Sequence, residues 1–193
     1  MTNSYRIALW NADGLIQRRH ETEMFIHKEK IDILLVTETH FTNKNYFSLE
    51  GYKCYSTIHP DGTAHAGTTI LIKKSLQLYE MEKHEKSHLK AISIKATDKN
   101  NTQITVSAVY CPPRYSITKE EFSTFFDTLG PKFIAGGDFN SKHLYWGSRL
   151  INPKGRNLYK EISSKGYNTL STRKPTYWPS DPNRLPDLLD FLY

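Results

Sequence analysis

The feature that most limits the fold of this chain is a series of short apolar runs, each about long enough for one buried β-strand. The stretches between some of them repeat apolar residues at helical spacing. The runs cover residues 5–10, 31–38, 68–74, 91–96, 103–110 and 132–137, and the helical stretches cover 17–29, 118–129 and 155–166. Strands and helices therefore alternate at both ends of the chain, around a β-rich stretch. This order predicts an α/β sandwich with helices on its outer faces.

The length of 193 residues suits a single domain. A net charge of +6 favours a polyanionic partner such as nucleic acid, although a similar balance is common on ordinary surfaces. The two cysteines, Cys54 and Cys111, are expected to be free thiols of a reducing compartment. The N-terminus shows no signal peptide, and no apolar run approaches the ~18 residues of a membrane span. We therefore expect a soluble, intracellular protein.

Polar residues stand where several of the apolar runs end, and loops at strand ends commonly carry functional groups. Each of these polar residues, taken by itself, has a non-functional explanation. The stretch "NADG" is typical of a turn, Glu38 could be a solvated residue at a strand end, and Tyr110 could be a core tyrosine. Five strand ends that each carry an acid, an amide or a phenol together indicate a shared site. These residues are Asn11, Asp13, Glu38, Tyr110, Asp138, Asn140 and Asp190, whereas Asp187 is taken only to precede a strand.

The stretch "FIAGGDFNSKHLYWGS" (133–148) places Asp138 and Asn140 side by side after two glycines. A carboxylate accepts a proton from water, and a carboxamide donates to a phosphate oxygen. The alternative is an Asx turn that only closes the strand. The stretch alone leaves both interpretations open.

Five motifs resemble the endonuclease/exonuclease/phosphatase superfamily, which includes apurinic/apyrimidinic endonucleases and deoxyribonuclease I. They are "WNADGL" (10–15), "IDILLVTET" (31–39), "VYCPP" (109–113), "GGDFNSKH" (136–143) and "LLDFL" (188–192). They follow the family's order and spacing along nearly the whole chain. The resemblance implies a four-layered α/β/β/α sandwich, deoxyribonuclease I-like, formed by residues 1–193 as one domain.

Three further stretches resemble one branch, the endonuclease domain of jockey-like non-LTR retrotransposon polyproteins. They are "GDFNSKHLYWGS", "NPKGRNLYKEI" and "KPTYWP". The branch implies DNA as a partner, a longer polyprotein with a reverse transcriptase, and a nuclear location.

The resemblance also implies a role for each strand-end residue. Glu38 matches the family's metal carboxylate, with Asn11 and Asp13 beside it as ligands or as partners of ligands. The metal is Mg²⁺ (or Mn²⁺), which prefers hard oxygen ligands and stabilises the leaving oxygen of a phosphate displacement.

Four residues match the family's catalytic positions. Asp138 matches the residue that positions or deprotonates the attacking water, and Asn140 matches the amide that donates to the phosphate. Tyr110 matches a phenol directed at the scissile phosphate. Asp190 matches a carboxylate that orients a histidine.

That histidine is the departure from the family pattern. It lies in a Ser-Asp-His segment after one further strand, and this sequence stops at Tyr193. The resemblance therefore implies a domain that is incomplete at its C-terminus and lacks the last strand segment, with uncertain activity as it stands. His143 matches a branch position behind the active-site residues. For His143 and for His40, however, we favour an exposed or capping role.

A nucleic-acid-binding surface is expected around "STRKPTYWP" (171–179). Arg173 and Lys174 would pair with phosphates, and Tyr177 and Trp178 would stack on bases. The alternative is that both aromatic residues are core and both cations are solvated. Arg114, after the Tyr110 strand, is a further candidate for contact with the DNA backbone.

The function that the resemblance implies is Mg²⁺-dependent nicking of target DNA to prime reverse transcription. An abasic-site repair nuclease or a superfamily phosphatase is the first alternative. The second is an inactive fragment or DNA-binding remnant.

Overall fold

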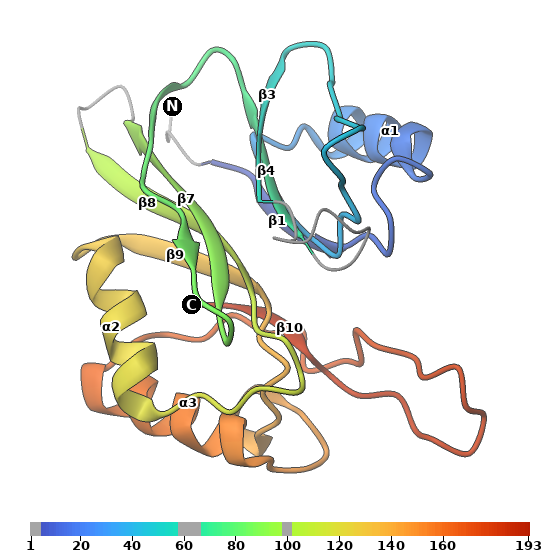
Figure 1. Ribbon diagram of the computed structural model, residues 1–193. Coiled ribbons are helices and arrows are strands. Elements are labelled where there is room, and N and C mark those ends of the chain that lie inside the picture. Colours follow the sequence, from blue (N-terminus) through green and yellow to red (C-terminus); the bar gives the residue numbers. More distant parts are fainter. Residues whose placement is uncertain (1–4, 58–66, 98–101) are drawn as a thin grey trace.

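The computed structural model describes residues 5–57, 67–97 and 102–193. Figure 1 shows two β-sheets with helix α1 beside one sheet and helices α2 and α3 beside the other. In the described residues, no helix is long and apolar enough to span a membrane. Both cysteines are free, as expected.

The first sheet has the strand order β1-β2-β4-β3. β1 (Ile7–Asn11) runs parallel to β2 (Ile33–Thr37). β4 (Thr68–Lys73) lies antiparallel between β2 and β3 (Tyr52–Ser56). Every residue of β2 is buried, as a continuous apolar run predicts for a central strand.

The second sheet has the order β10-β9-β8-β7-β5. β8 (Gln103–Tyr110) is antiparallel to β7 (Lys90–Thr97) and parallel to β9 (Phe133–Asp138), and β9 pairs antiparallel with β10 (Asp190–Leu192). The short strands β5 (Gln77–Glu80) and β6 (His84–Glu85) both pair with β7. β8 and β9 are therefore flanked on both sides, which fixes their ends.

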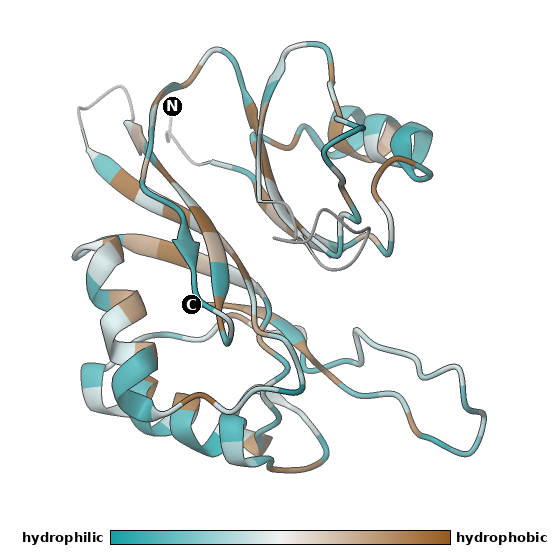
Figure 2. Ribbon diagram, in the orientation of Figure 1, coloured by the Kyte–Doolittle hydropathy of each residue, from teal (hydrophilic) through white to brown (hydrophobic). Residues whose placement is uncertain are grey.

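The two sheets share an apolar interior. Ile33 and Leu35 of β2 pack in one cluster with Ile92 and Ile94 of β7 and Ala108 of β8. In Figure 2 the hydrophobic colours concentrate along the strands, while much of the helical surface is hydrophilic. Burial of this apolar surface is the main free-energy gain that holds the sheets face to face.

The helices cover the outer faces of the two sheets. α1 (Arg19–Glu29) packs Ile26 against Leu34 and Val36 of the first sheet. α2 (Lys119–Leu129) and α3 (Pro153–Lys165) lie on the second sheet. Their core side chains are Phe122, Phe125, Phe126, Leu129, Leu158 and Ile162. The expected four-layered α/β/β/α order is confirmed.

The helix ends follow local chemistry that the sequence contains. Thr118 and Glu121 form a reciprocal capping box at the start of α2. Asn152 caps α3 ahead of Pro153, so this helix begins two residues before the expected range. Gly166 ends α3 with a φ of 69°, as predicted for a left-handed C-cap.

Candidate active site

Three of the expected catalytic residues come together at one end of the second sheet. Tyr110 ends β8, Asp138 ends β9, and Asp190 begins β10. Tyr110 pairs with Asp138 in the parallel register, and Asp138 pairs with Asp190 in the antiparallel one. The three residues therefore lie on neighbouring strands in one row.

Asn140 joins this row through the loop after β9. Its backbone N–H donates to Asp138 Oδ1 at 2.8 Å, which is an Asx turn. Its side-chain Nδ2 donates to the backbone carbonyl of Cys111 at 3.1 Å. The backbone of Asn140 has a φ of 47°, a conformation uncommon outside glycine. The carboxamide thus spans the loops that follow β8 and β9.

The glycine before Asp138 allows β9 to approach β8 closely. A Cβ built on Gly137, whose φ is 155°, would lie 1.8 Å from the carbonyl oxygen of Val109. Any side chain here would push β9 away from β8 and separate Asp138 from Tyr110.

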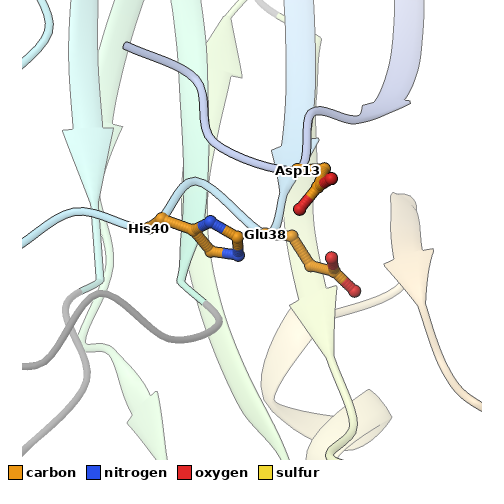
Figure 3. A group of neighbouring side chains, drawn as sticks. All are labelled: Asp13, Glu38 and His40. Carbon is orange, nitrogen blue, oxygen red and sulfur yellow. The ribbon is translucent and has the colours of Figure 1, made fainter. Parts of the chain in front are cut away.

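A second group of residues lies at the end of the first sheet. Ligand atoms of Asp13, Glu38 and His40 all lie within 4.8 Å of one another, and Figure 3 shows the three side chains. Backbone hydrogen bonds hold their loops together. Gly14 N–H donates to Glu38 O at 2.8 Å, and Leu15 N–H donates to Thr39 O at 3.1 Å.

All three residues of this group have a left-handed backbone. The φ angles are 44° for Asp13, 51° for Glu38 and 55° for His40. Such conformations cost ~1–3 kcal/mol each in a residue other than glycine, and they cluster at functional sites. The surrounding fold therefore imposes this arrangement.

Asn11 Oδ1 accepts from the backbone N–H of Asp13 at 3.3 Å, so this oxygen supports the loop that carries Asp13. One placement differs from expectation. His40, for which we favoured an exposed or capping role, is half-buried and belongs to that group. No spacing motif in the sequence pairs His40 with Asp13, because only the pairing of β1 with β2 brings their loops together.

The electrostatics join the two groups into one site. Burial, together with the charges of Asp138 and Glu38, raises the pKa of Tyr110 to about 12. Burial also raises the pKa of Asp138 well above its usual range, with additional upward effects from Asp190 and Glu38. Glu38 from the first sheet thus acts electrostatically on residues of the second sheet, and β1 and β2 contact β9 between the sheets.

Asp190, which we expected to orient a histidine, lies beside a threonine. The Thr176 hydroxyl accepts from the Asp190 N–H at 3.1 Å, and this side chain lowers the pKa of Asp190 against the effect of burial. Among the described residues, Asp190 Oδ1 is buried without a hydrogen-bond partner. Burial is the main cause that raises the pKa of Asp190 to about 6, and the charge of Glu38 adds to it.

We predict that Asp190→Asn stabilises the fold at alkaline pH. The pKa of Asp190 is higher in the folded protein than in the unfolded chain. The contribution of protonated Asp190 to folding stability is therefore fully present below pH ~4 and is lost as the pH rises through ~6. At pH 8 the neutral amide should therefore raise the free energy of unfolding by roughly 1–3 kcal/mol. Thermal unfolding at pH 4, 6 and 8 measures this. Asp127→Asn, on the surface of α2, is the control. A variant less stable than wild type at pH 8 would contradict the expectation.

His143 caps the short helix η1 (Leu144–Trp146). Its Nδ1 accepts from the Tyr145 N–H at 3.2 Å, and its ring stacks on Tyr159 at 4.2 Å between centroids. The capping role that we favoured is confirmed. The side chain that supports Asn140 directly is instead Asn152, whose Nδ2 donates to the Asn140 carbonyl at 3.0 Å.

The residues expected to bind nucleic acid are all exposed. Tyr177 is 45% and Trp178 is 66% exposed, so the alternative that these aromatics are core is wrong. Arg173 and Lys174 are exposed beside them. In Figure 1 the chain before β10 forms a loop that projects from the body of the molecule, and Tyr177 pairs with Asp187 in this part of the chain. Arg173 instead packs against Gly147 of the body. The exposed Arg114 lies over the ring of Tyr115, with 4.8 Å from its guanidinium carbon to the ring centroid.

The chain is similar in sequence to retrotransposon proteins. Residues 104–191 match the family described as Endonuclease-reverse transcriptase. The chain is 35% identical over 195 residues to the RNA-directed DNA polymerase from mobile element jockey of Drosophila melanogaster. It is 33% identical over 187 residues to the probable RNA-directed DNA polymerase from transposon X-element of the same species. Each match covers 96% of this chain and 20% of the relative, so the chain spans about one fifth of their length.

Solved structures share the fold. The endonuclease domain of TRAS1, a telomere-specific non-LTR retrotransposon, matches with a TM-score of 0.75 and 20% identity over 98% of this chain and 84% of that one. The catalytic domain of Xenopus laevis APE2 matches with a TM-score of 0.70 and 14% identity over 96% of this chain and 81% of that one. The sequence matches and the shared fold thus bear out the resemblance to the endonuclease/exonuclease/phosphatase superfamily and to the endonuclease domains of jockey-like retrotransposons.

Proposed function

We propose that this chain is a metal-dependent DNA endonuclease that nicks one strand and leaves a 3′ hydroxyl to prime reverse transcription. The observation that carries the proposal is the meeting of two groups at one edge of the sandwich. Asp13, Glu38 and His40 come from the first sheet, and the row of Tyr110, Asp138 and Asp190 comes from the second.

The first group fits a divalent cation. Asp13 and Glu38 offer the carboxylate oxygens that Mg²⁺ and Mn²⁺ prefer, and His40 offers an imidazole nitrogen. When bound there, the ion would supply positive charge that stabilises a negatively charged leaving oxygen. The imidazole favours Mn²⁺ over Mg²⁺, because nitrogen ligands suit later transition ions better than the harder Mg²⁺.

The second group fits the proton chemistry of phosphodiester hydrolysis. Asp138 accepts the proton of the attacking water, whose oxygen bonds to phosphorus while the bond from phosphorus to O3′ breaks. A raised pKa suits this role, because a base works best when its pKa approaches the working pH. Tyr110 remains protonated at neutral pH and donates to the phosphate, and the Asn140 amide does the same.

The exposed side chains of Arg173, Lys174, Tyr177 and Trp178 fit a DNA contact. Exposed aromatic rings stack on bases, and nearby cations neutralise phosphates. Arg114, in the loop after Tyr110, would contact the backbone close to the scissile phosphate.

We predict that Trp178→Ala weakens DNA binding while the chemical step remains intact. Base stacking on an aromatic ring contributes about 1–3 kcal/mol, so the KM for a DNA duplex should rise about 5- to 150-fold. The kcat should stay within about twofold of wild type. The exposed Tyr79, on β5, provides the control variant Tyr79→Ala. A fall in kcat at unchanged KM would contradict this role.

Conversion of supercoiled plasmid to open circles tests the proposed activity. Wild type should nick with Mg²⁺ or Mn²⁺ and stop when EDTA is added, and a polymerase should extend the nicked ends directly. A DNA duplex that contains one abasic site distinguishes the proposed activity from that of a repair nuclease. A repair nuclease would cleave preferentially at the abasic site. Absence of nicking under every condition would favour the inactive remnant.

The relatives are RNA-directed DNA polymerases, and the chain matches about one fifth of each. We propose that it acts within such a polyprotein, on nuclear DNA. A reverse-transcriptase reading frame joined to this sequence would test that arrangement.

A further inference from the structure

The first turn of α3 lies behind the candidate catalytic loop and holds its backbone. Asn152 Oδ1 accepts from the backbone N–H groups of Lys142 at 3.0 Å and Gly155 at 2.6 Å, and its Nδ2 donates to the Asn140 carbonyl at 3.0 Å. A Cβ on Gly155 would lie 1.9 Å from the Lys142 carbonyl oxygen. Helix and loop are therefore in direct backbone contact.

Lys154, in the same turn, reaches the other loop of the site. Its Nζ donates to the Pro112 carbonyl at 2.7 Å. The adjacent carbonyl of Cys111 accepts from Asn140 Nδ2 at 3.1 Å. Two successive carbonyls after Tyr110 thus bind one side chain from α3 and one from the catalytic loop.

Packing alone does not account for a lysine at this position. Lys154 is only 6% exposed, and burial of an ammonium group is costly. A cation in the first turn of a helix also opposes the helix dipole. Burial accordingly lowers the pKa of Lys154, while Cys111 and Asp138 raise it. The positive charge in turn lowers the pKa of Asp138, against the effects of Asp190 and Glu38.

We propose that Lys154 is a positioning residue, which fixes the loop after Tyr110 against Asn140 and supplies buried positive charge to Asp138. It does not touch substrate. It keeps the phenol of Tyr110 and the amide of Asn140 in one arrangement and favours the ionised form of the carboxylate between them. The kinetic consequence rests on the proposed function, whereas the structural consequence does not.

Lys154→Met tests the kinetic consequence, because methionine keeps the length and removes the donor and the charge. A misplacement of about 1 Å at a reacting centre costs ~10²-fold, so kcat for plasmid nicking should fall about 10²-fold with KM within twofold. Lys154→Gln keeps a donor without charge and should lie between Met and wild type. Lys160→Met, exposed on the same helix, should match wild type. A wild-type kcat in Lys154→Met and Lys154→Gln would overturn the proposal.

A double-variant cycle separates positioning from general destabilisation. If Lys154 acts through the loop that Asn140 binds, Lys154→Met should cost much less in an Asn140→Ala background than in wild type. Equal fold-losses in both backgrounds would indicate independent effects and would overturn the proposal.

Hydrogen exchange tests the structural consequence without any activity. The Cys111 N–H donates to Asp138 O at 2.9 Å, and the Asn140 N–H donates to Asp138 Oδ1 at 2.8 Å. Both amides should exchange at least about tenfold faster in Lys154→Met, while amides of α2 keep their rates. Unchanged exchange at both amides would overturn the role of Lys154. A wild-type chain that never nicks would overturn the proposed function alone.

Discussion

Glu38→Gln will remove metal-dependent nicking with little change in the fold. Glu38 is half-buried beside Asp13 and His40. Its charge helps to raise the pKa values of Tyr110, Asp138 and Asp190. Glutamine keeps the volume and loses the anionic ligand. Charge stabilisation by a metal contributes several kcal/mol, so a loss of about 4 kcal/mol lowers the nicking rate about 10³-fold. Single-turnover nicking of plasmid over a range of Mn²⁺ concentrations measures the change.

A direct measurement of metal binding accompanies the kinetics. Titration with Mn²⁺, followed by calorimetry, should show one site in wild type and a much weaker one in Glu38→Gln. Glu80→Gln, exposed at the end of β5, is the matched control. Wild-type Mn²⁺ affinity in Glu38→Gln would place the ion elsewhere, and nicking that persists in EDTA would point to a different mechanism.

Asp138→Asn will lose the chemical step and keep DNA binding. The amide oxygen can still accept from the Asn140 N–H, as Asp138 Oδ1 does at 2.8 Å, but it cannot take a proton from water. General bases contribute about 10²–10⁴-fold, so kcat should fall by that factor while KM changes little. The raised pKa of Asp138 gives the wild-type enzyme an acidic limb, in which activity falls as the pH drops through that pKa. This limb should be absent from any residual activity of the variant.

Stability supplies the internal control for this variant. Burial penalises the ionised form of Asp138, so replacement by a neutral amide should not lower the free energy of unfolding at pH 8. If the variant has both a lower free energy of unfolding and a lower nicking rate, the loss of activity could be explained by loss of structure. A variant that nicks at the wild-type rate would remove Asp138 from the chemistry.

The sequence alone predicted strands β1, β2, β4, β7, β8 and β9, the three α-helices, and the polar residues at several strand ends, but not the separate strands β3, β5 and β6. Continuous apolar runs are local signals of buried strands, and β2 is buried throughout as such a run implies. Thr118 with Glu121, and Gly166, mark helix ends because caps act within a few residues. The motifs then placed Tyr110, Asp138 and Asp190 at strand ends, where the register of β8, β9 and β10 aligns them.

The tertiary structure alone decided that His40 lies beside Asp13 and Glu38, and that Lys154 is buried. The left-handed backbone of Glu38 has no local signal, because glutamate is not among the residues that commonly adopt it. Lysine in a polar segment likewise predicts a solvated side chain. Lys154 is buried because a loop more than forty residues earlier presents the Pro112 carbonyl to it. Local sequence determines where strands and helices begin and end, but contacts between distant segments determine which side chains those ends bring together.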